Sequence, residues 1–397
     1  MSNSYSVITQ ITNESMRVAH EQCTFLSTID RQYDDSYAKK GAKIGSALRV
    51  RKPDEFSVTT ASRVIDVQEQ AEDYETITMA SQYHVDMYFT SDEMTLSLDE
   101  LSKRKITPAM KRLVSKIESD VLQGCTKLVY NQTGTAGTAL GNSGDLSAIF
   151  NARAKLNQGL APMSDRSLQI DSIQMASIVN GAKALFHDQK QLTKGFVEGA
   201  YGRAAGLDWY ENERCYAHAN STDHTNVAVN DTVTTGREYI VLSGATMSVG
   251  TVFTISGVYA VHPETKATMS HLAQYVVTAV SSTAYSVSPS FISTGAKQNC
   301  DALPESGATV TAAGSASTTY RTGIVYHKEA FAFVTADLPL FAGADRCQRL
   351  TQDGLSLRVW QDGDIVNDRM LLRIDMLFGY AVLRPEWACR LIGSANA

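Results

Sequence analysis

The chain has no long apolar stretch and no paired cysteines, and these absences exclude several classes of protein. No run approaches the roughly 18 apolar residues of a transmembrane helix. The first residues, Met1 to Tyr5, contain no basic region followed by an apolar run, so we expect no secretory signal. The 6 cysteines are scattered without a Cys-x-x-Cys pair, which favours free thiols in a reducing compartment over a disulfide framework.

The chain also has fewer basic than acidic residues. The chain has 36 Lys and Arg against 42 Asp and Glu, for a formal net charge of -6. No global basic field exists to hold nucleic acid by counterion release, so any contact with DNA must be local or weak. The 43% of hydrophobic and 20% of charged residues are typical of a folded chain, and the length of 397 residues allows two to three domains.

The sharp enzymatic motifs are missing. There is no Gly-x-Ser-x-Gly elbow, no His-Glu-x-x-His helix and no phosphate loop. The glycine-rich stretch 195–206 lacks the residues that would touch phosphates, so we expect a flexible loop there. Six carboxylates fall where turns are expected, and we interpret them as solvated turn acids, with a catalytic pair among them as the alternative: Asp337, Asp345, Asp353, Asp362, Asp364 and Asp368.

One spacing comes close to a metal-ligand pattern. Cys215-x-x-His218 is followed by Asp223 and His224, and two elements could bring these side chains together. Such a pattern is weak on its own, and a polar strand end followed by a turn explains it as well. We therefore expect no metal and no cofactor, and bound metal in the purified protein would overturn this.

The first hundred residues predict an arm and a β excursion. A helical pattern covers Thr12 to Lys40, and glycines at 41 and 45 end it. Two strand-like runs follow, at Ala47 to Val67 and at Thr76 to Thr90, with the period of two of half-exposed strands. The excursion carries a mixture of charges that either solvent or a partner subunit could pair: Arg49, Arg51, Lys52, Asp54 and Glu55.

A long amphipathic helix is predicted from Pro108 to Tyr130. Its apolar positions follow the 3, 4, 3, 4 spacing of one buried face, over a length of roughly 30 Å. The opposite face, with Glu118 and Asp120, is predicted to be solvated. This helix and the residues before it hold the densest basic cluster of the chain: Lys103, Arg104, Lys105, Lys111, Arg112 and Lys116.

Composition changes sharply in the second half. From Ser221 to Tyr320 only Arg237, Lys266 and Lys297 are basic, and short β-branched runs alternate with turn signals. This pattern predicts a small all-β barrel or sandwich inserted into the chain. From Gly323 the composition returns to that of the first half of the chain. Two strands are expected to join across Gln361–Asp364. The fold class is therefore α+β, with one pair of domains split by a β insertion.

Three blocks of sequence carry a resemblance to a known family. The segment from His84 to Met110 resembles the junction of extended loop and spine helix in the coat proteins of short-tailed enterobacterial phages. These are major capsid proteins with the Hong Kong 97-type fold and an inserted β-barrel. The other matches are Ala205–Tyr210 with Val249–Lys266, and Arg373–Glu386.

The resemblance implies a division of the chain. It suggests an N-terminal arm, an extended β-hairpin loop, a spine helix, and peripheral and axial domains around the insertion. The implied ranges are 1–40 for the arm, 41–92 for the extended loop, 93–144 for the spine helix and peripheral domain, 145–221 and 321–344 for the axial domain, 222–320 for the inserted barrel, and 345–397 for the peripheral strands.

The implied function is structural and non-catalytic. Copies of the chain are expected to form hexamers and pentamers of an icosahedral shell, assembled with scaffolding and portal proteins in the host bacterial cytoplasm. The procapsid would then expand around packaged double-stranded DNA, held by weak non-specific contact, and the protein would reside in the virion capsid without touching a membrane. We expect the assembly to be non-covalent, although Lys52 lies in the loop that cross-links in one member of the wider fold.

Three sets of residues are candidates for contacts between subunits. The charges from Arg49 to Glu55 would pair with a neighbouring subunit. The inserted domain of this family links capsomers through a protruding loop, placed here at Val258–Leu272 with His262, Glu264 and Lys266 as polar contacts. The basic cluster from Lys103 to Lys116 would face DNA or scaffold. The alternative from another class is a cytoplasmic enzyme or binding module with a β-rich accessory domain, using the glycine-rich loop before Asp208 as a lid.

Overall fold

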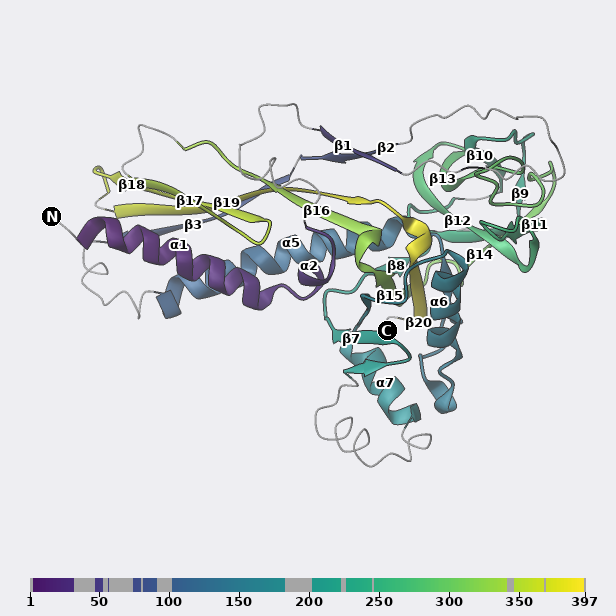
Figure 1. Cartoon of the computed structure of the whole chain (residues 1–397), viewed down its shortest axis with the longest axis horizontal. Helices are drawn as coiled ribbons and strands as arrows, with labels where there is room; N and C mark the ends of the chain where they lie inside the picture. The colour runs from purple at the N-terminus through teal and green to yellow at the C-terminus, as the bar shows by residue number, and fades with distance from the viewer. Residues whose placement is uncertain are drawn as a thin grey trace. The chain divides into compact units, whose positions relative to one another are not determined.

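The chain divides into two compact units (Figure 1). The first comprises Met1–Lys52, Tyr74–Val121 and Phe331–Ala381, and the second comprises Pro53–Asp73, Leu122–Ala330 and Val382–Ala397. The computed structural model describes residues 3–31, 47–52, 56, 74–79, 81–90, 102–182, 202–222, 226–244, 246–340, 346–367 and 369–395.

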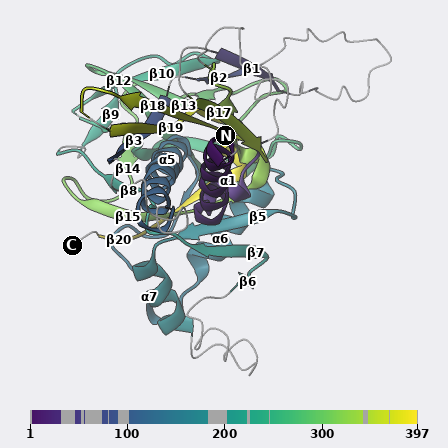
Figure 2. The ribbon, with the colours of Figure 1, turned by 90° about the vertical axis from the view of Figure 1, so that its left-hand side faces the viewer.

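The first unit is built on a five-stranded sheet in the order β16-β19-β18-β17, with β3 on the other side of β19. Apolar side chains alternate along the strands and bury one face, among them Leu357, Val359, Leu372 and Ile374. The helices α1 and α5 lie side by side beneath this sheet (Figure 2). The strands are β3 (Ser81–Thr90), β16 (Phe331–Ala336), β17 (Arg346–Gln352), β18 (Leu355–Asp364) and β19 (Arg369–Val382).

Helix α5, Thr107–Leu128, matches the predicted long helix closely. Met110, Leu113, Ile117 and Val121 are all buried, as the 3, 4 spacing requires. A five-residue π-helix, Ser102–Ile106, leads into it.

The arm differs from its prediction. Instead of one helix from Thr12 to Lys40, helix α1 covers Asn3–Gln22 and the short helix α2 covers Phe25–Thr28. The break has a tertiary cause, since backbone N–H groups at the start of α2 donate to a buried carboxylate of α5. The predicted segment beyond residue 31 lies outside the described residues.

Strands β1 (Ala47–Arg51) and β2 (Tyr74–Thr78) pair antiparallel. The expected first strand to Val67 is therefore described only as far as Arg51, and the residues at the far end of the excursion lie outside the described part of the chain.

The second unit contains a mixed sheet in the order β4-β20-β15-β5-β7-β6, with β8 paired to β15. Asp145 Oδ1 accepts the Ser147 N–H at 2.8 Å beside the start of α6. The elements are β4 (Gln132–Thr133), a 3-10 turn (Asn142–Gly144), α6 (Ser147–Gln158), β5 (Arg166–Ile170), α7 (Ser172–Ala182), β6 (Arg203–Ala204), β7 (Leu207–Glu211), β8 (Ala217–Ala219), β15 (Thr319–His327), 3-10 turns at Lys328–Ala330 and Pro385–Trp387, and β20 (Ala388–Ala395).

A closed barrel of six strands, β10-β13-β12-β11-β14-β9, also belongs to the second unit. Its interior is filled by aromatic and β-branched side chains, including Phe253, Tyr275 and Phe291. The barrel confirms the predicted inserted β-barrel. Its strands are β9 (Val227–Val229), β10 (Arg237–Ser243), β11 (Val252–Val261), β12 (Thr268–Ser281), β13 (Ala284–Phe291) and β14 (Thr309–Ala312).

One turn lies further along than expected. Strand β18 continues through Gln361–Asp364, because these residues pair with Arg369–Leu372 of β19, and the reversal follows Asp364. None of the described helices combines the length and apolarity needed to cross a membrane.

Candidate assembly surfaces

The β1–β2 hairpin has a polar face and an apolar face. Arg49 and Arg51 are exposed, together with Tyr74 across the hairpin, whereas Val50 and Ile77 are buried on the opposite face. The Arg49 guanidinium lies 4.7 Å from the centre of the Tyr74 ring, a distance typical of a cation–π contact. The exposed face therefore presents two guanidinium groups beside an aromatic ring.

The rest of the predicted loop cluster is only partly described. The Lys52 ammonium lies 3.0 Å from the Glu75 carboxylate, so this lysine has a partner within its own chain. Asp54 and Glu55 lie outside the described residues. A contact of this cluster with a neighbouring subunit stays a prediction.

The basic cluster before and along α5 is exposed for the most part. The side chains of Arg104, Lys111 and Arg112 are exposed, and the Lys116 ammonium pairs with Asp120 at 2.8 Å, one helical turn away. Lys105 is half-buried, with its ammonium 5.0 Å from the centre of the Phe89 ring. The Lys103 side chain lies outside the description. Arg104 projects from the π-helix, and Lys111 and Arg112 project from the beginning of α5.

Glu118, predicted to be solvated on the same face, is in fact fully buried. Its carboxylate accepts the N–H of Phe25 at 2.8 Å and that of Thr24 at 3.3 Å. It thus satisfies N–H groups at the start of α2 that have no partner within that helix. Periodicity could not show this, because the covering segment lies more than 90 residues away in sequence.

The residues predicted for the protruding loop form a tight hairpin turn between β11 and β12. His262 Nδ1 accepts the N–H groups of Glu264 and Thr265 at 3.2 and 3.3 Å. The Lys266 ammonium donates to the carbonyl oxygens of Ala296 and Gln298 within the same barrel. Lys266 is therefore half-buried against its own chain, whereas Glu264 is exposed.

A buried polar cluster that the sequence did not reveal fastens the barrel to the end of α5. Arg390 is 1% exposed, and its guanidinium donates to the carbonyl oxygens of Lys127 at 2.6 Å and Gly250 at 2.7 Å. Burial lowers the pKa of Arg390 to about 10. Nearby, the Gln274 amide exchanges two hydrogen bonds of 2.9 and 3.0 Å with the backbone of Gln132. We call Arg390, Lys127, Gly250, Gln132 and Gln274 the barrel anchor.

His218 belongs to the surroundings of this anchor. Its ring nitrogens contact the Tyr216 hydroxyl at 2.9 Å and the Thr251 hydroxyl at 3.3 Å. These neighbours satisfy the imidazole with hydroxyl groups, and Asp223 and His224 lie outside the described residues. Within the described part of the chain, no group of three or more His, Cys, Asp or Glu side chains could hold a metal ion.

Asp337 corrects the view of the late carboxylates as solvated turn acids. It is 6% exposed, and its carboxylate accepts the Ser356 hydroxyl at 2.6 Å and lies 3.3 Å from the Arg349 guanidinium. Asp353, Asp362 and Asp364 are at least partly exposed. Asp345 and Asp368 lie outside the described residues.

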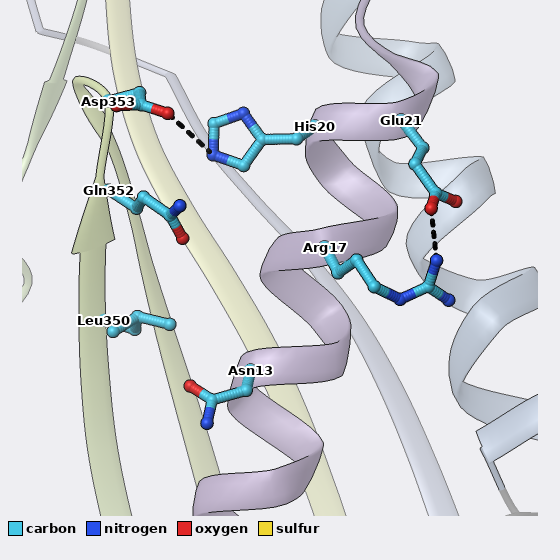
Figure 3. A pocket seen from close by; sticks show the side chains of 7 residues that line it. All are labelled: Asn13, Arg17, His20, Glu21, Leu350, Gln352 and Asp353. Carbon is cyan, nitrogen blue, oxygen red and sulfur yellow. Dashed lines mark hydrogen bonds and ion pairs between the residues drawn. The ribbon is translucent and has the colours of Figure 1, made fainter.

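A pocket of about 500 Å³ lies between α1 and the β17–β18 turn (Figure 3). His20 Nε2 lies 3.9 Å from Asp353 Oδ2, and Arg17 pairs with Glu21 on the other side. Burial lowers the pKa of His20. The remaining lining is Asn13, Leu350 and Gln352. The described lining contains no serine, cysteine or lysine.

Comparison with known proteins decides the family. The sequence model of the family described as "P22 coat protein - gene protein 5" matches residues 172–393, which is more than half of the 397 residues. The chain belongs to the P22 coat protein family. The predicted identity as a major capsid protein of tailed phages is thereby confirmed.

One solved structure shares the fold of this coat protein, and two others are similar to it in part. A structure from Mycobacterium phage Che8 has a TM-score of 0.51 at 11% identity, covering 93% of this chain and 90% of that one. The asymmetric unit of the bacteriophage PhiM1 mature capsid has a TM-score of 0.45 at 11% identity, covering 94% and 89%. The CUS-3 coat protein I-domain is 28% identical over 24% of this chain and 93% of its own, with a TM-score of 0.18. No curated protein matches.

The coat protein thus has the Hong Kong 97-type capsid fold with an added barrel, as the resemblance implied. It is a structural protein of a phage capsid, in a shell assembled from copies of itself.

Proposed function

We propose that this coat protein assembles with a scaffolding protein into an icosahedral procapsid, which then expands around packaged double-stranded DNA. The observation that carries the proposal is the family match over residues 172–393. Hexamers and pentamers of the chain close the shell, one vertex incorporates a portal protein, and assembly takes place in the cytoplasm of the bacterial host.

The charge distribution supports a container for DNA. The net charge of -6 leaves no basic wall that would hold the packaged genome tightly. The exposed cations Arg104, Lys111 and Arg112 are confined to one helix and its approach. We assign this face to weak, non-specific contact with DNA or with scaffold.

The β1–β2 hairpin supplies a contact between neighbouring subunits in this proposal. Arg49 and Arg51 face away from the buried side of the hairpin and are exposed, and we assign them to contacts with carboxylates of another copy. A single exposed ion pair contributes only roughly 0 to 1 kcal/mol. Such weak contacts, repeated over the shell, allow errors to dissociate during assembly and subunits to rearrange during expansion.

We keep the predicted domain division as part of the proposal. The barrel strands from Val227 to Ala312 fall within the inserted domain at 222–320. In the hairpin turn of that domain, Glu264 is the side chain assigned to a contact between capsomers, because Lys266 is held by its own chain.

Co-expression with a candidate scaffolding protein tests the proposal. We expect closed shells in sucrose gradients and electron micrographs, and larger, thinner shells after heating or DNA packaging. Denaturing gels of these particles should show single chains, because the assembly is non-covalent. Small oligomers with and without scaffold would refute scaffold-directed assembly, and a ladder of covalent multimers would refute the non-covalent shell.

A further inference from the structure

The turn between β18 and β19 ends in two bare aliphatic side chains. Ile365 is 97% exposed and Val366 is 86% exposed, the highest values among the large apolar side chains of the described residues. Apolar groups so completely exposed at the end of a hairpin commonly mark a contact with another molecule.

The backbone of this turn is held in one conformation. Asp364 Oδ1 accepts the N–H groups of Val366 and Asn367 at 3.0 and 3.3 Å, and Oδ2 accepts the Asn367 side-chain amide at 2.7 Å. The amide hydrogen bond from Asn367 lowers the pKa of Asp364, so the carboxylate stays charged and keeps accepting at neutral pH. A turn fixed in this way loses little conformational entropy when its side chains are buried by a partner.

An apolar groove of about 340 Å³ lies on the sheet next to this turn. On the face directed away from the buried core, Asp362, Leu371 and Tyr88 form one cross-strand row, and Trp360, Arg373 and Asp86 form the next. Leu371 is 46% and Tyr88 is 53% exposed. Asp362 and Asp86 stand at the outer ends of their rows, on β18 and β3, whereas Arg373 stands between Trp360 and Asp86 on β19.

The groove is open because the chain segment that packs on this face of the sheet does not extend over it. In the following row, Arg358 and Asp375 are 4% and 0% exposed. The Arg358 guanidinium donates to the carbonyl oxygen of Pro339 at 2.8 Å, in the segment that leaves β16. Among the described residues, that segment covers the Arg358 row and leaves the rows of Trp360 and Leu371 exposed.

The side chains at the turn cannot fill the groove of their own chain. Ile365 lies three residues beyond Asp362 along the hairpin, which corresponds to roughly 10 Å at the rise of a β-strand. The hairpin is fixed by the pairing of β18 with β19 and of β19 with β3. An occupant from this turn must therefore come from a second copy of the chain.

We propose that Ile365 and Val366 of one subunit insert into the groove formed by Tyr88, Trp360 and Leu371 of a second subunit. The charges beside the two surfaces are complementary. Arg369 at the base of the turn can approach Asp86 and Asp362 beside the groove of the second copy, whereas Arg373 already lies 2.5 Å from Asp375 Oδ1 in its own chain. In its own chain, the Arg369 Nε lies 3.8 Å from Asp364 Oδ2, and its guanidinium lies 5.4 Å from the centre of the Tyr88 ring.

This contact joins two different surfaces, so each subunit gives one hairpin end and receives another. Contacts of this kind repeat from copy to copy and close into rings where the rotation allows. The second copy is a neighbour in the capsid shell, and to that extent the inference rests on the capsid function. It adds a contact that does not involve the β1–β2 hairpin.

Cysteine cross-linking in assembled particles tests the contact. Ile365→Cys and Leu371→Cys are placed in one chain, and a mild oxidant is added, which takes up the two electrons and two protons released as the thiols form a disulfide. The two positions in one chain are too far apart to bridge, because a disulfide needs Cα atoms within about 7 Å. We expect a ladder of multimers on non-reducing gels, and single chains from either single variant.

Two results would overturn the proposal. Particles of the double variant that give only single chains would show that the groove is not the partner of the turn. Multimers from Ile365→Cys alone would show that two turns meet each other instead.

A second pair of variants covers the case in which the cysteines disturb assembly. Ile365→Ser with Val366→Ser is expected to leave the monomer's thermal unfolding unchanged, because both side chains are in water, and to lower particle yield at least tenfold. Ile173→Ser, at a site 54% exposed on α7, is the matched control with unchanged yield expected. Equal yields for the double serine variant and the unaltered protein would refute the contact.

Discussion

The guanidinium of Arg390 donates a 2.7 Å hydrogen bond to the carbonyl oxygen of Gly250, although 140 residues separate them in sequence. The same guanidinium donates to Lys127 at the end of α5, 263 residues away. One buried side chain therefore joins the barrel, the C-terminal strand and the long helix. A planar group with donors on several sides is suited to this role.

Replacement of Arg390 is expected to loosen the barrel anchor. Arg390→Met leaves two buried carbonyl oxygens without a donor and should lower the free energy of unfolding by about 3 kcal/mol. The free energy of unfolding of Arg390→Lys should fall between those of Arg390→Met and the unaltered protein, because one ammonium group cannot reach both carbonyl oxygens. Urea unfolding measures the loss, and limited proteolysis should cut near the barrel junctions sooner. A methionine variant as stable as the parent would refute the role of the anchor.

Gly250 is expected to tolerate no side chain. Its φ of +94° already disfavours other residues, and an added Cβ would lie 3.3 Å from the Tyr216 hydroxyl and 3.5 Å from His218 Nδ1. Gly236 is the matched control, since its φ is +85° and an added Cβ would meet nothing within 4 Å. We expect Gly250→Ala to lower the melting temperature more than Gly236→Ala does. Equal losses would mean that backbone strain alone, and not the fit against Tyr216, makes the glycine necessary.

Removal of the Glu118 carboxylate should release the start of α2. Glu118→Ala leaves the N–H groups of Thr24 and Phe25 buried without an acceptor, at a cost of roughly 2 kcal/mol in the free energy of unfolding. Glu118→Gln keeps one acceptor oxygen and should cost less. Lys111→Ala, at an exposed position of the same helix, serves as control. Hydrogen exchange should rise at residues 24–28 in the alanine variant, and unchanged protection there would contradict the assignment.

His327 should make the protein less stable in mild acid. Burial lowers its pKa, outweighing the nearby Glu329 and Asp165, while Arg166 and Arg384 lower it further. Its Nδ1 also accepts the Glu329 N–H at 3.3 Å, a bond that a protonated ring cannot accept.

The direction of this pH dependence follows from proton binding. Below the ordinary histidine pKa of about 6.5, the unfolded chain takes up a proton that the folded chain does not, so stability is full above that pH and falls below it. Melting temperatures between pH 8 and pH 5 should decline less in His327→Gln than in the parent. At pH 8, the difference in melting temperature between His327→Gln and the unaltered protein measures only the loss of packing. If the melting temperatures of both proteins decline in parallel towards pH 5, the prediction is wrong.

Charge reversal on α5 should affect assembly without affecting folding. Lys111→Glu with Arg112→Glu changes two exposed side chains, so thermal unfolding of the monomer should change little. Scaffold binding or the amount of packaged DNA should fall several-fold, because weak contacts to an anionic partner depend on net charge. Lys328→Glu, at an exposed position of the second unit, provides a control reversal elsewhere. Unchanged assembly and packaging would remove the basic face from the proposed function.

The sequence by itself predicted the elements whose signal is local. The 3, 4 spacing placed α5 within about two residues of its observed ends, and β-branched runs between turn signals placed the barrel. These patterns are informative because a buried helix face and a half-buried strand each repeat over a few residues. The resemblance of the segment His84–Met110 then indicated the capsid family. Neither the amino-acid composition nor the net charge pointed to that family.

Only the tertiary structure decided which polar side chains are buried and with what they pair. Glu118 and Asp337 looked like solvated acids because their local patterns are polar, yet residues of other helices and strands bury both. Lys266 turned out to be held by its own barrel, and the anchor at Arg390 had no local signal at all. Periodicity records which side of an element is apolar, whereas the partner of a buried polar group is set by contacts between separate elements, and these contacts exist only once the chain has folded.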